Sequence, residues 1–198
     1  MRILAFADIH TSLAAIRNIK DKAIAHDVDY IVCVGDFTIF GSELLNVLKK
    51  FNEIEKPFLL VHGNHEDERK LRTACSQFKN LRYIHAAAYR DGSYLFLGWG
   101  GGGFSFFDKS FEAHSVQLTR YVKPGDNVVF VTHQPPYNTK VDQIMGQPVG
   151  SKSFRKFIDN EKPALVLCGH LHENFNKEDR LGPTRIINPG KTGTLIDL

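Results

Sequence analysis

Short apolar runs recur along this chain, and most of them end at or near a polar residue. Each run is rich in β-branched or aromatic residues and has the length of a strand that is buried on both faces. The seven runs are Arg2–Phe6, Tyr30–Val34, Phe58–Val61, Tyr94–Leu97, Val128–Val131, Ala164–Leu167 and Arg185–Ile187. Because strands of this kind need a covering layer on each side, the pattern favours an α/β fold.

Helical patterns separate several of the runs. The first follows a Thr11/Ser12 cap and has one apolar face, made of Leu13, Ile16, Ala23 and Ile24. The second follows Ser42 as its cap and has an apolar face of Leu44, Leu45, Leu48 and Phe51. Together with the flanking strands they predict two βαβ units, and a further helical pattern lies near Ser153–Asn160.

The middle of the chain has a different pattern. From Leu81 to Gly103 helical periodicity gives way to Tyr, Phe and Gly with a turn signal at Asp91-Gly92, which predicts antiparallel strands. A mixed sheet, or two packed sheets, follows from this change. The Gly98–Gly103 run formally matches GxGxxG, the motif of dinucleotide-binding sites, but the residues after it do not begin a convincing helix. We expect instead that the glycines let the backbone pass close to a functional site. The Gln134–Gly150 stretch is predicted to be a long functional surface loop.

Composition indicates a single globular domain over residues 1–198. A chain of 198 residues with 42% hydrophobic residues buries a substantial core without disulfides. The net charge of +3 is too small to indicate a nucleic-acid-binding surface. No segment has the length of a membrane span or a signal peptide. Cys33 and Cys168 each end an apolar run, so we expect both to be buried free thiols in a reducing compartment. We therefore expect a cytoplasmic protein that does not enter a membrane.

Polar blocks of one kind follow five of the runs. They contain five of the nine histidines, and they are Asp8-Ile9-His10, Gly35-Asp36, Gly63-Asn64-His65-Glu66, Thr132-His133 and Gly169-His170-Leu171-His172. Ligand sites of parallel α/β sheets form beyond the carboxyl ends of the strands, so we expect the blocks to converge. Imidazole, carboxylate and amide oxygen together suit divalent first-row ions. The glycines before three candidate ligands would let the backbone come close to such ions.

The number of candidate ligands exceeds what one ion needs. They are Asp8, His10, Asp36, Asn64, His133, His170 and His172. Two ions roughly 3.5–4 Å apart that share a carboxylate would use all of them, and such pairs activate water and neutralise charge in phosphoryl displacement. We expect Mn²⁺ at both positions, with Fe, Zn, Ni or Co as the other candidates.

In this order, the DxH, GD, GNH, later His and GHxH blocks resemble the signature of the calcineurin-like metallophosphoesterase superfamily, and of its small single-domain members in particular. The resemblance extends from residue 8 to residue 172. It implies a four-layer α-β-β-α sandwich of two mixed β-sheets flanked by helices. It also implies two ligand sets, with Asp8, His10, Asp36 and His172 around one ion and Asp36, Asn64, His133 and His170 around the other.

The resemblance implies metal-dependent hydrolysis of a small phosphoester. A hydroxide between the two ions would attack phosphorus in line, and His65 would protonate the leaving oxygen or stabilise its charge. Asp36 would bridge the two ions. Asp36 and His65 are therefore the candidate catalytic residues.

Three positions depart from the pattern of the protein serine/threonine phosphatases of this superfamily. Those enzymes have an aspartate and then an arginine after the GD block and an arginine before GNH, where this chain has Ile39, Phe40 and His62. The arginines bind a phosphomonoester dianion, and the aspartate orients the catalytic histidine. Without them we expect a phosphodiester, with nucleotides and cyclic nucleotides as candidates. Aromatic contacts to its leaving group are expected from Phe37, Phe40, Phe104, Phe106 and Phe107.

Several other polar residues have a simpler interpretation. His26, His85 and His114 lie outside every block and are expected to be solvated or hydrogen-bonded. His62 either supports the ligands from behind or only satisfies a backbone group, and both interpretations stay open. Glu66 is expected to cap or support the following helix rather than to bind metal.

Other functions also stay open. The chain could be a phosphomonoesterase of the same fold, or a metal-binding scaffold with vestigial activity, as some relatives of the superfamily are. A nuclease is disfavoured by the short chain and weak net charge. A structural zinc site is disfavoured because no CxxC is present. The physiological substrate, the native metal and the oligomeric state are not determined by these residues.

Overall fold

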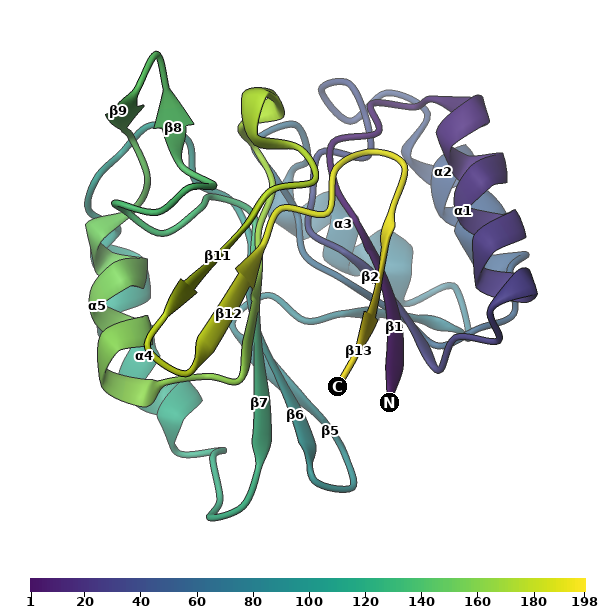
Figure 1. Ribbon diagram of the computed structural model, residues 1–198. Coiled ribbons are helices and arrows are strands. Elements are labelled where there is room, and N and C mark those ends of the chain that lie inside the picture. The colour runs from purple at the N-terminus through teal and green to yellow at the C-terminus, as the bar shows by residue number, and fades with distance from the viewer.

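The computed structural model describes all residues from Met1 to Leu198 and contains two large sheets packed face to face (Figure 1). The first sheet has five strands in the order β13-β1-β2-β3-β4. The strands are β1 (Arg2–Phe6), β2 (Tyr30–Cys33), β3 (Phe58–Leu60), β4 (Leu81–Tyr83) and β13 (Thr194–Asp197). Strands β1 to β4 are parallel, whereas β13 pairs with β1 in the antiparallel direction, so the sheet is mixed.

The second sheet has six strands in the order β11-β12-β10-β7-β6-β5. They are β5 (Ala87–Asp91), β6 (Tyr94–Trp99), β7 (Asn127–Thr132), β10 (Leu165–Leu167), β11 (Glu178–Leu181) and β12 (Thr184–Ile187). The four inner strands are parallel, and the two edge strands β5 and β11 are antiparallel to their neighbours. This sheet is therefore mixed as well.

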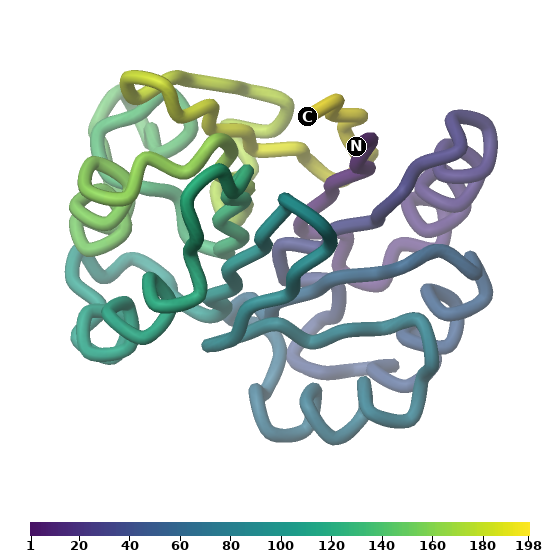
Figure 2. Tube along the Cα trace, turned by 90° about the horizontal axis from the view of Figure 1, so that it is seen from below, coloured from purple at the N-terminus to yellow at the C-terminus, as the bar shows by residue number.

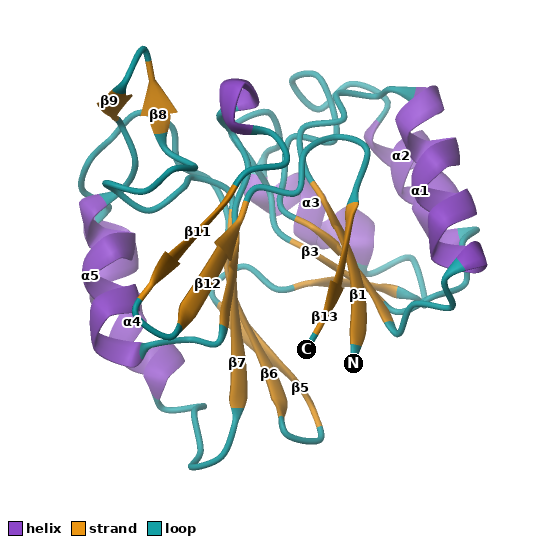
Figure 3. Ribbon diagram, viewed as in Figure 1, coloured by secondary structure: helices purple, strands orange, loops and turns teal.

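Helices cover the outer face of each sheet (Figure 3). The helices α1 (Leu13–Ala25), α2 (Leu44–Asn52) and α3 (Glu68–Cys75) pack on the first sheet, and α4 (Lys109–Thr119) and α5 (Lys152–Glu161) pack on the second. Three apolar clusters fill the three interfaces between these four layers. The predicted four-layer sandwich is confirmed.

Strand β1 shows how the sequence produces these layers. Its side chains alternate, so Ile3 and Ala5 face the cluster between the two sheets while Leu4 and Phe6 face the helices. Because both faces are apolar, the strand has no polar side that could lie against water. All seven predicted strands are present, within a few residues of the predicted bounds.

One part of the predicted strand pattern is wrong. Antiparallel strands were expected in the Leu81–Gly103 segment, yet its first strand, β4, is parallel to β3, and β6 is also parallel to β7 on its other side. The helix α3 lies between β3 and β4 and supplies the crossover that a parallel connection requires. The rest of the segment forms the predicted hairpin, in which Asp91 of β5 pairs with Tyr94 of β6 across Gly92.

The first helix begins as predicted and the second does not. Ser12 caps α1 by accepting a hydrogen bond from the N–H of Ala15 at 3.3 Å. Ser42 is not the cap of α2, because Glu43 is the residue before the helix and has a left-handed backbone without a side-chain capping bond.

Some residues of the predicted apolar faces are exposed. Leu13 and Ile24 of α1 and Leu45 of α2 are more than half exposed. Each helix contacts the sheet through a narrower stripe than its apolar pattern suggested. In α1 this stripe is Ala15, Ile16, Ile19 and Ala23.

The segment Gln134–Gly150 is more ordered than a surface loop. It contains a short hairpin of β8 (Gln143–Ile144) and β9 (Gln147–Pro148), and the buried carboxylate of Asp142 accepts hydrogen bonds from the backbone N–H groups of Asn138, Thr139 and Gly150. Buried polar groups of this kind hold a loop in one conformation because each donor needs a partner.

The two ends of the chain lie side by side at one edge of the first sheet (Figure 2). Met1 and Leu198 exchange backbone hydrogen bonds, which extends the pairing of β1 with β13. Cys33, Cys75 and Cys168 are free and buried, as predicted for the first and last of them. None of the helices combines the length and the apolar character needed to cross a membrane.

Candidate metal centre

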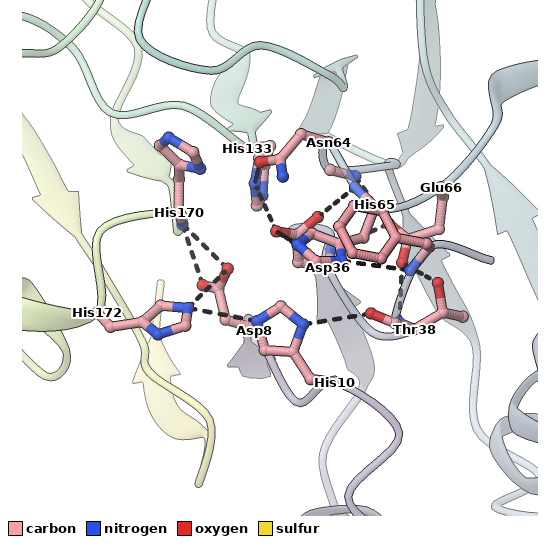
Figure 4. Close-up of polar contacts among 12 residues, drawn as sticks. Asp8, His10, Asp36, Thr38, Asn64, His65, Glu66, His133, His170 and His172 are labelled. Carbon is pink, nitrogen blue, oxygen red and sulfur yellow. Dashed lines mark hydrogen bonds and ion pairs between the residues drawn. The ribbon is translucent and has the colours of Figure 1, made fainter. Parts of the chain in front are cut away.

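The loops after β1, β2, β3, β7 and β10 bring the predicted ligands together (Figure 4). Three of these strands belong to the first sheet and two to the second. All five loops leave the carboxyl ends of parallel strands, so they meet where the two sheets present the same edge. The predicted convergence is present.

One group of ligands consists of Asp8, His10 and His172. One ligand atom from each lies within 4.8 Å of the others. The Nε2 atoms of His10 and His172 are 3.3 Å apart, and Nε2 of His172 is 3.8 Å from Oδ1 of Asp8. Two imidazole nitrogens and a carboxylate that face one another are a donor set for a divalent first-row ion.

A second group consists of Asp36, His133 and His170. Nε2 of His133 lies 3.4 Å from Oδ2 of Asp36 and 3.2 Å from Oδ1 of Asn64, so the amide oxygen joins this group. Asp36 also lies within the same 4.8 Å limit of His10 and His65. The Asp36 carboxylate is therefore situated between the two groups.

The backbone holds two of the histidines in the tautomer that binds metal. Nδ1 of His133 lies 2.9 Å from the carbonyl oxygen of Val34, and Nδ1 of His10 lies 3.2 Å from that of Thr38. Only a protonated Nδ1 can donate to a carbonyl, so the neutral rings carry their proton there. When a ring is neutral, as binding of a metal ion requires, the lone pair of its Nε2 is directed at the site.

His170 supplies an independent test of whether metal fits. Its Nε2 atom is buried and has no hydrogen-bond partner in the protein. Burial, followed by the charge on His133, lowers the pKa of His170 to about 4, so the ring is neutral at physiological pH. A buried neutral nitrogen without a partner is unfavourable unless a ligand completes it. The residues present therefore fit a divalent metal ion.

Asp36 and His133 attract each other inside the protein. Burial disfavours the charged form of each, but the attraction between them outweighs it, lowering the pKa of Asp36 to about 2 and raising that of His133 to about 9. Asp36 is thus ionised throughout the physiological range. An ionised carboxylate at this position attracts cations.

The ligand loops have a strained backbone. Asp8, His10, Asp36 and His170 all have positive φ values, of 54°, 44°, 50° and 69°. Non-glycine residues rarely adopt this left-handed conformation, and such strain concentrates at functional sites. The interactions of the loops are therefore strong enough to hold four candidate ligands in it.

The glycines before the ligands leave no room for a side chain. A Cβ atom at Gly63 would overlap the carboxylate of Asp36, and one at Gly35 would lie 2.8 Å from Nδ1 of His133. Gly35 also has a φ of 105°, which disfavours any other residue. The predicted close approach of the backbone is present.

Glu66 does not cap the next helix, contrary to the prediction. Asp67 caps α3, because its side chain accepts a hydrogen bond from the N–H of Lys70. The buried carboxylate of Glu66 instead accepts bonds from the backbone N–H groups of Asp36 and Gly63 through Oε2, and from the N–H and hydroxyl of Thr38 through Oε1. It joins the loops after β2 and β3, which carry Asp36 and Asn64.

Phe40 contacts His65 through both its backbone and its side chain. The backbone N–H of Phe40 donates to Nδ1 of His65 at 3.3 Å, and the Phe40 ring stacks on the imidazole with the ring centres 4.4 Å apart. Because Nδ1 is the acceptor, the neutral ring carries its proton on Nε2. Nε2 lies 3.9 Å from Oδ2 of Asp36, so this proton is directed towards the metal ligands. A main-chain donor thus orients the ring without a carboxylate at Ile39.

The environment of His62 matches neither interpretation that the sequence left open. Its Nδ1 atom lies 2.7 Å from the hydroxyl of Tyr83, and its ring packs edge-on against His85. Burial lowers the pKa of His62 to about 4, so the neutral ring accepts this bond from the tyrosine. The His62 ring packs against the Gly100–Gly101 backbone rather than the candidate ligands, and its carbonyl accepts a hydrogen bond from the N–H of Gly101 at 2.7 Å.

The remaining histidines are consistent with the prediction. The N–H of Gly100 donates to Nδ1 of His85 at 2.8 Å, and Nδ1 of His114 lies 2.9 Å from the carbonyl of Ser110. His26 is exposed at the end of α1. None of the three belongs to a group of candidate ligands.

The five candidate aromatic contacts separate into two kinds. Phe37 is completely buried in the cluster under the first sheet, so it cannot contact a substrate and that prediction is wrong. The other four are exposed by 40% or more: Phe40, Phe104, Phe106 and Phe107. The ring of Phe104 lies 4.9 Å from that of His170, which places it directly beside the ligands.

Two supporting residues could not be found from the sequence. Thr38 contributes its carbonyl oxygen to His10, and a backbone contribution leaves no mark on the side-chain pattern. Asn188 donates to the carbonyl of Leu171 and accepts from the N–H of Gly190, which ties the loop of His170 and His172 to the turn before β13.

Known proteins resemble this chain over almost its whole length. An uncharacterized protein of Methanocaldococcus jannaschii, MJ1162, is 33% identical over 96% of this chain and 88% of its own length. The structure of TT1561 of Thermus thermophilus superimposes with a TM-score of 0.81 at 18% identity, covering 96% of this chain and 89% of that one. An archaeal phosphodiesterase superimposes with a TM-score of 0.56 at 18% identity, covering 96% and 84%.

The sequence profile of the calcineurin-like phosphoesterases matches residues 1–174, which contain all five polar blocks. The sheets and flanking helices agree with that fold. The family is one of metal-dependent hydrolases that act on phosphoesters, and this chain has candidate His and Asp ligand groups after the carboxyl ends of its parallel strands. The chain therefore belongs to the calcineurin-like phosphoesterase family.

Proposed function

We propose that the protein is a phosphodiesterase with a dinuclear metal centre. The observation that carries this proposal is the pair of ligand groups on either side of Asp36, together with the buried Nε2 atom of His170 that lacks a partner. Asp8, His10 and His172 would hold one ion, and Asn64, His133 and His170 the other, with Asp36 shared by both. The ligand types favour Mn²⁺ among the first-row ions considered.

When bound, the two ions would supply an activated water and neutralise the charge that develops on the phosphoryl oxygens. The protein's own part is to orient the substrate and to place a proton. His65 directs Nε2–H into the site because Phe40 occupies Nδ1, so it can donate to the leaving oxygen. Phe40 shields one face of that imidazole from water, which strengthens the hydrogen bond it makes.

A diester is favoured over a monoester by the charge around the site. None of the hydrogen bonds or ion pairs of the candidate ligands involves arginine or lysine. The positions of the phosphatase aspartate and arginines are filled by Ile39, Phe40 and His62, and His62 is turned towards Tyr83. A diester carries one negative charge fewer than a dianionic monoester, so it depends less on such partners. The archaeal phosphodiesterase of the same fold agrees with this choice.

The proposal is tested by hydrolysis of bis-p-nitrophenyl phosphate and p-nitrophenyl phosphate with added Mn²⁺, alongside metal analysis of the purified protein. The expected result is two ions per chain and a higher kcat/KM for the diester. Asp36→Asn should lose both ions, whereas Asp21→Asn on the exposed face of α1 should keep both ions and the full activity. Turnover that survives Asp36→Asn, or no turnover with any divalent first-row ion, would contradict the proposal.

The scaffold alternative is separated by His65→Ala. The enzyme proposal expects kcat to fall by about 10²–10⁴, the usual contribution of a general acid, while both ions stay bound. A scaffold expects no dependence of any activity on His65. We also propose a reducing, cytoplasmic location, because three free cysteines are buried in the fold.

A further inference from the structure

An open pocket adjoins the metal centre on the side of His170. It has a volume of about 530 Å³ and lies between the Gly-rich segment and the start of α4. Phe104, Phe107, Lys109, Ser110 and Gln134 line it together with the backbone of Gly102 and Gly103. We call it the loop pocket. No candidate metal ligand belongs to its lining.

Two contacts make the loop pocket continuous with the site. Gln134 follows the ligand His133 directly in the chain, and the ring of Phe104 lies 4.9 Å from the ring of the ligand His170. A group attached to a phosphate at the metal centre would reach the pocket along these two residues. The pocket is therefore a place for part of the substrate rather than for a separate ligand.

The walls of the loop pocket are built and held in place. Gln134 is buried, and its Nε2 donates to the carbonyl of Ser105 at 3.0 Å, which fixes the segment that carries Phe104. The ammonium group of Lys152 lies over the rings of Phe106 and Phe107, at 4.9 Å and 5.7 Å from their centres. These contacts hold the wall in the absence of a ligand.

The exposed aromatic surface indicates the kind of group that binds. Phe104 is 65% exposed and Phe107 is 59% exposed, so both rings leave apolar surface in contact with water. Asp108, the acidic residue of the lining, directs its carboxylate away to Trp99 and to the N–H of Phe111. A planar aromatic group on a phosphate suits such a pocket, because it can stack on phenylalanine without meeting a free carboxylate.

The position of His65 decides which ester group enters the pocket. His65 and His170 lie on opposite sides of the ligand cluster, with Asp8 and Asp36 between them (Figure 4). The leaving oxygen is expected beside His65, which Phe40 covers. We propose that the loop pocket binds the retained ester group, the one that stays on phosphorus after hydrolysis, and that it prefers an aromatic group such as an aryl ring or a nucleobase.

This inference rests on the proposed phosphodiesterase function, and two diesters with the same leaving group test it. Phenyl p-nitrophenyl phosphate and methyl p-nitrophenyl phosphate both release p-nitrophenol and differ only in the retained group. The wild-type enzyme should favour the phenyl diester, and Phe104→Ala should reduce the ratio of the two kcat/KM values by about three- to tenfold, as expected for one aromatic contact. Phe104→Leu should reduce it less, because leucine keeps apolar bulk.

Two control variants separate a pocket from a general effect. Phe40→Ala removes an exposed aromatic ring at the other end of the cluster and should slow both diesters while their ratio stays the same. Tyr121→Ala removes an exposed ring outside the lining and should change neither value. The metal content of each variant is measured, because Phe104 also touches the ligand His170. A ratio that follows Phe40 instead of Phe104 would overturn the assignment.

A binding experiment distinguishes failure of this inference from failure of the proposed function. Phenylphosphonate and methylphosphonate are not hydrolysed, and their affinities for the Mn²⁺-loaded protein can be compared by calorimetry. Tighter binding of phenylphosphonate that is lost in both Phe104→Ala and Phe107→Ala supports the loop pocket even if no diester is turned over. Equal affinities of the two phosphonates for the wild type would refute it, whatever the enzyme hydrolyses.

Discussion

At the scale of single residues, the candidate metal centre depends on groups that are not themselves candidate ligands. Glu66 is buried, and its two oxygens accept four hydrogen bonds from the loops that carry Asp36 and Asn64. Burial raises the pKa of Glu66, and the bonds from Gly63 and Thr38 oppose that rise. Because Asp36 has a strained backbone, a carboxylate that anchors its N–H is what keeps the loop in place.

Glu66→Gln is expected to loosen this anchor. One oxygen becomes an NH₂ group, so two buried donors lose their acceptor, and the free energy of unfolding should fall by about 2–4 kcal/mol. Metal affinity should fall about 10–100-fold, as for other residues that orient ligands. Urea unfolding and metal titration measure the two effects.

Glu68→Gln is the matched control for this prediction. The same substitution two residues later changes a half-exposed side chain that pairs with Arg72 on the surface of α3. It should change the free energy of unfolding by less than about 0.5 kcal/mol and leave metal affinity unchanged. Equal effects of the two variants would show that Glu66 has no special role.

At the scale of elements, each of the five loops is positioned by the strand before it. The antiparallel edge strands do not carry ligands, and they need other contacts to stay in register. Arg90 of β5 pairs with Asp126, the residue before β7, and its Nη2 atom also donates to the carbonyl of Tyr121. This pair ties the outer hairpin to the strand that positions His133.

The Arg90–Asp126 pair predicts a pH dependence of stability. The hydrogen bond and charge of Arg90, with the N–H of Lys123, lower the pKa of Asp126 to about 2 from its ordinary 3.8. A carboxyl group whose pKa is lower in the folded protein stabilises the fold above the unfolded value and stops doing so as the pH falls through the folded value. Asp126→Asn should therefore destabilise the protein at neutral pH, and its difference from wild type should narrow between about pH 4 and pH 2.

Urea unfolding of both proteins at several pH values measures this difference. Asp21→Asn, which changes an exposed carboxylate on α1, should show a much smaller difference from wild type at every pH. If the difference between Asp126→Asn and wild type stayed constant down to pH 2, ionisation of Asp126 would not contribute to folding.

At the scale of the whole molecule, the two sheets share one apolar layer. Its 16 buried residues come from both sheets, and the candidate metal centre lies where the carboxyl ends of the two sets of parallel strands meet. Neither sheet can keep its inner face buried without the other. Folding of both sheets should therefore be a single cooperative event.

Leu59→Ala in β3 and Leu167→Ala in β10 test this cooperativity. Both leucines are fully buried in the layer between the sheets, so each substitution should lower the free energy of unfolding by about 2–5 kcal/mol. Each substitution should shift a single transition common to both sheets, because the lost side chain leaves a cavity in the layer that both sheets share.

Two probes measure this transition in the presence of chelator. Far-UV circular dichroism reports all strands and helices, and the fluorescence of Trp99, the single tryptophan, reports the second sheet. Leu45→Ala, at an exposed position of α2, is the control and should shift the transition by less than about 0.5 kcal/mol. Separate transitions by the two probes would show that the sheets unfold independently.

The sequence by itself determined the strands, the α/β class and the seven candidate ligands, because each rests on a local signal. Apolar runs predict buried strands, and a ligand that follows a strand directly needs no other information to be placed at its carboxyl end. The four-layer arrangement came from the resemblance carried by the same blocks. The errors at Ser42, Leu45 and Glu66 lie where a neighbouring element, and not local pattern, decides the environment.

Only the tertiary structure decided how the site is supported and bounded. The anchor at Glu66, the Phe40 bond to His65 and the loop pocket at Phe104 each join residues that are distant in the chain. Such contacts depend on how the two sheets pack, and hydrogen bonds and ring contacts between distant residues leave no periodic mark in the sequence. The candidate ligands of this protein are therefore readable from residue types, whereas the surroundings that would select a substrate are a property of the packed fold.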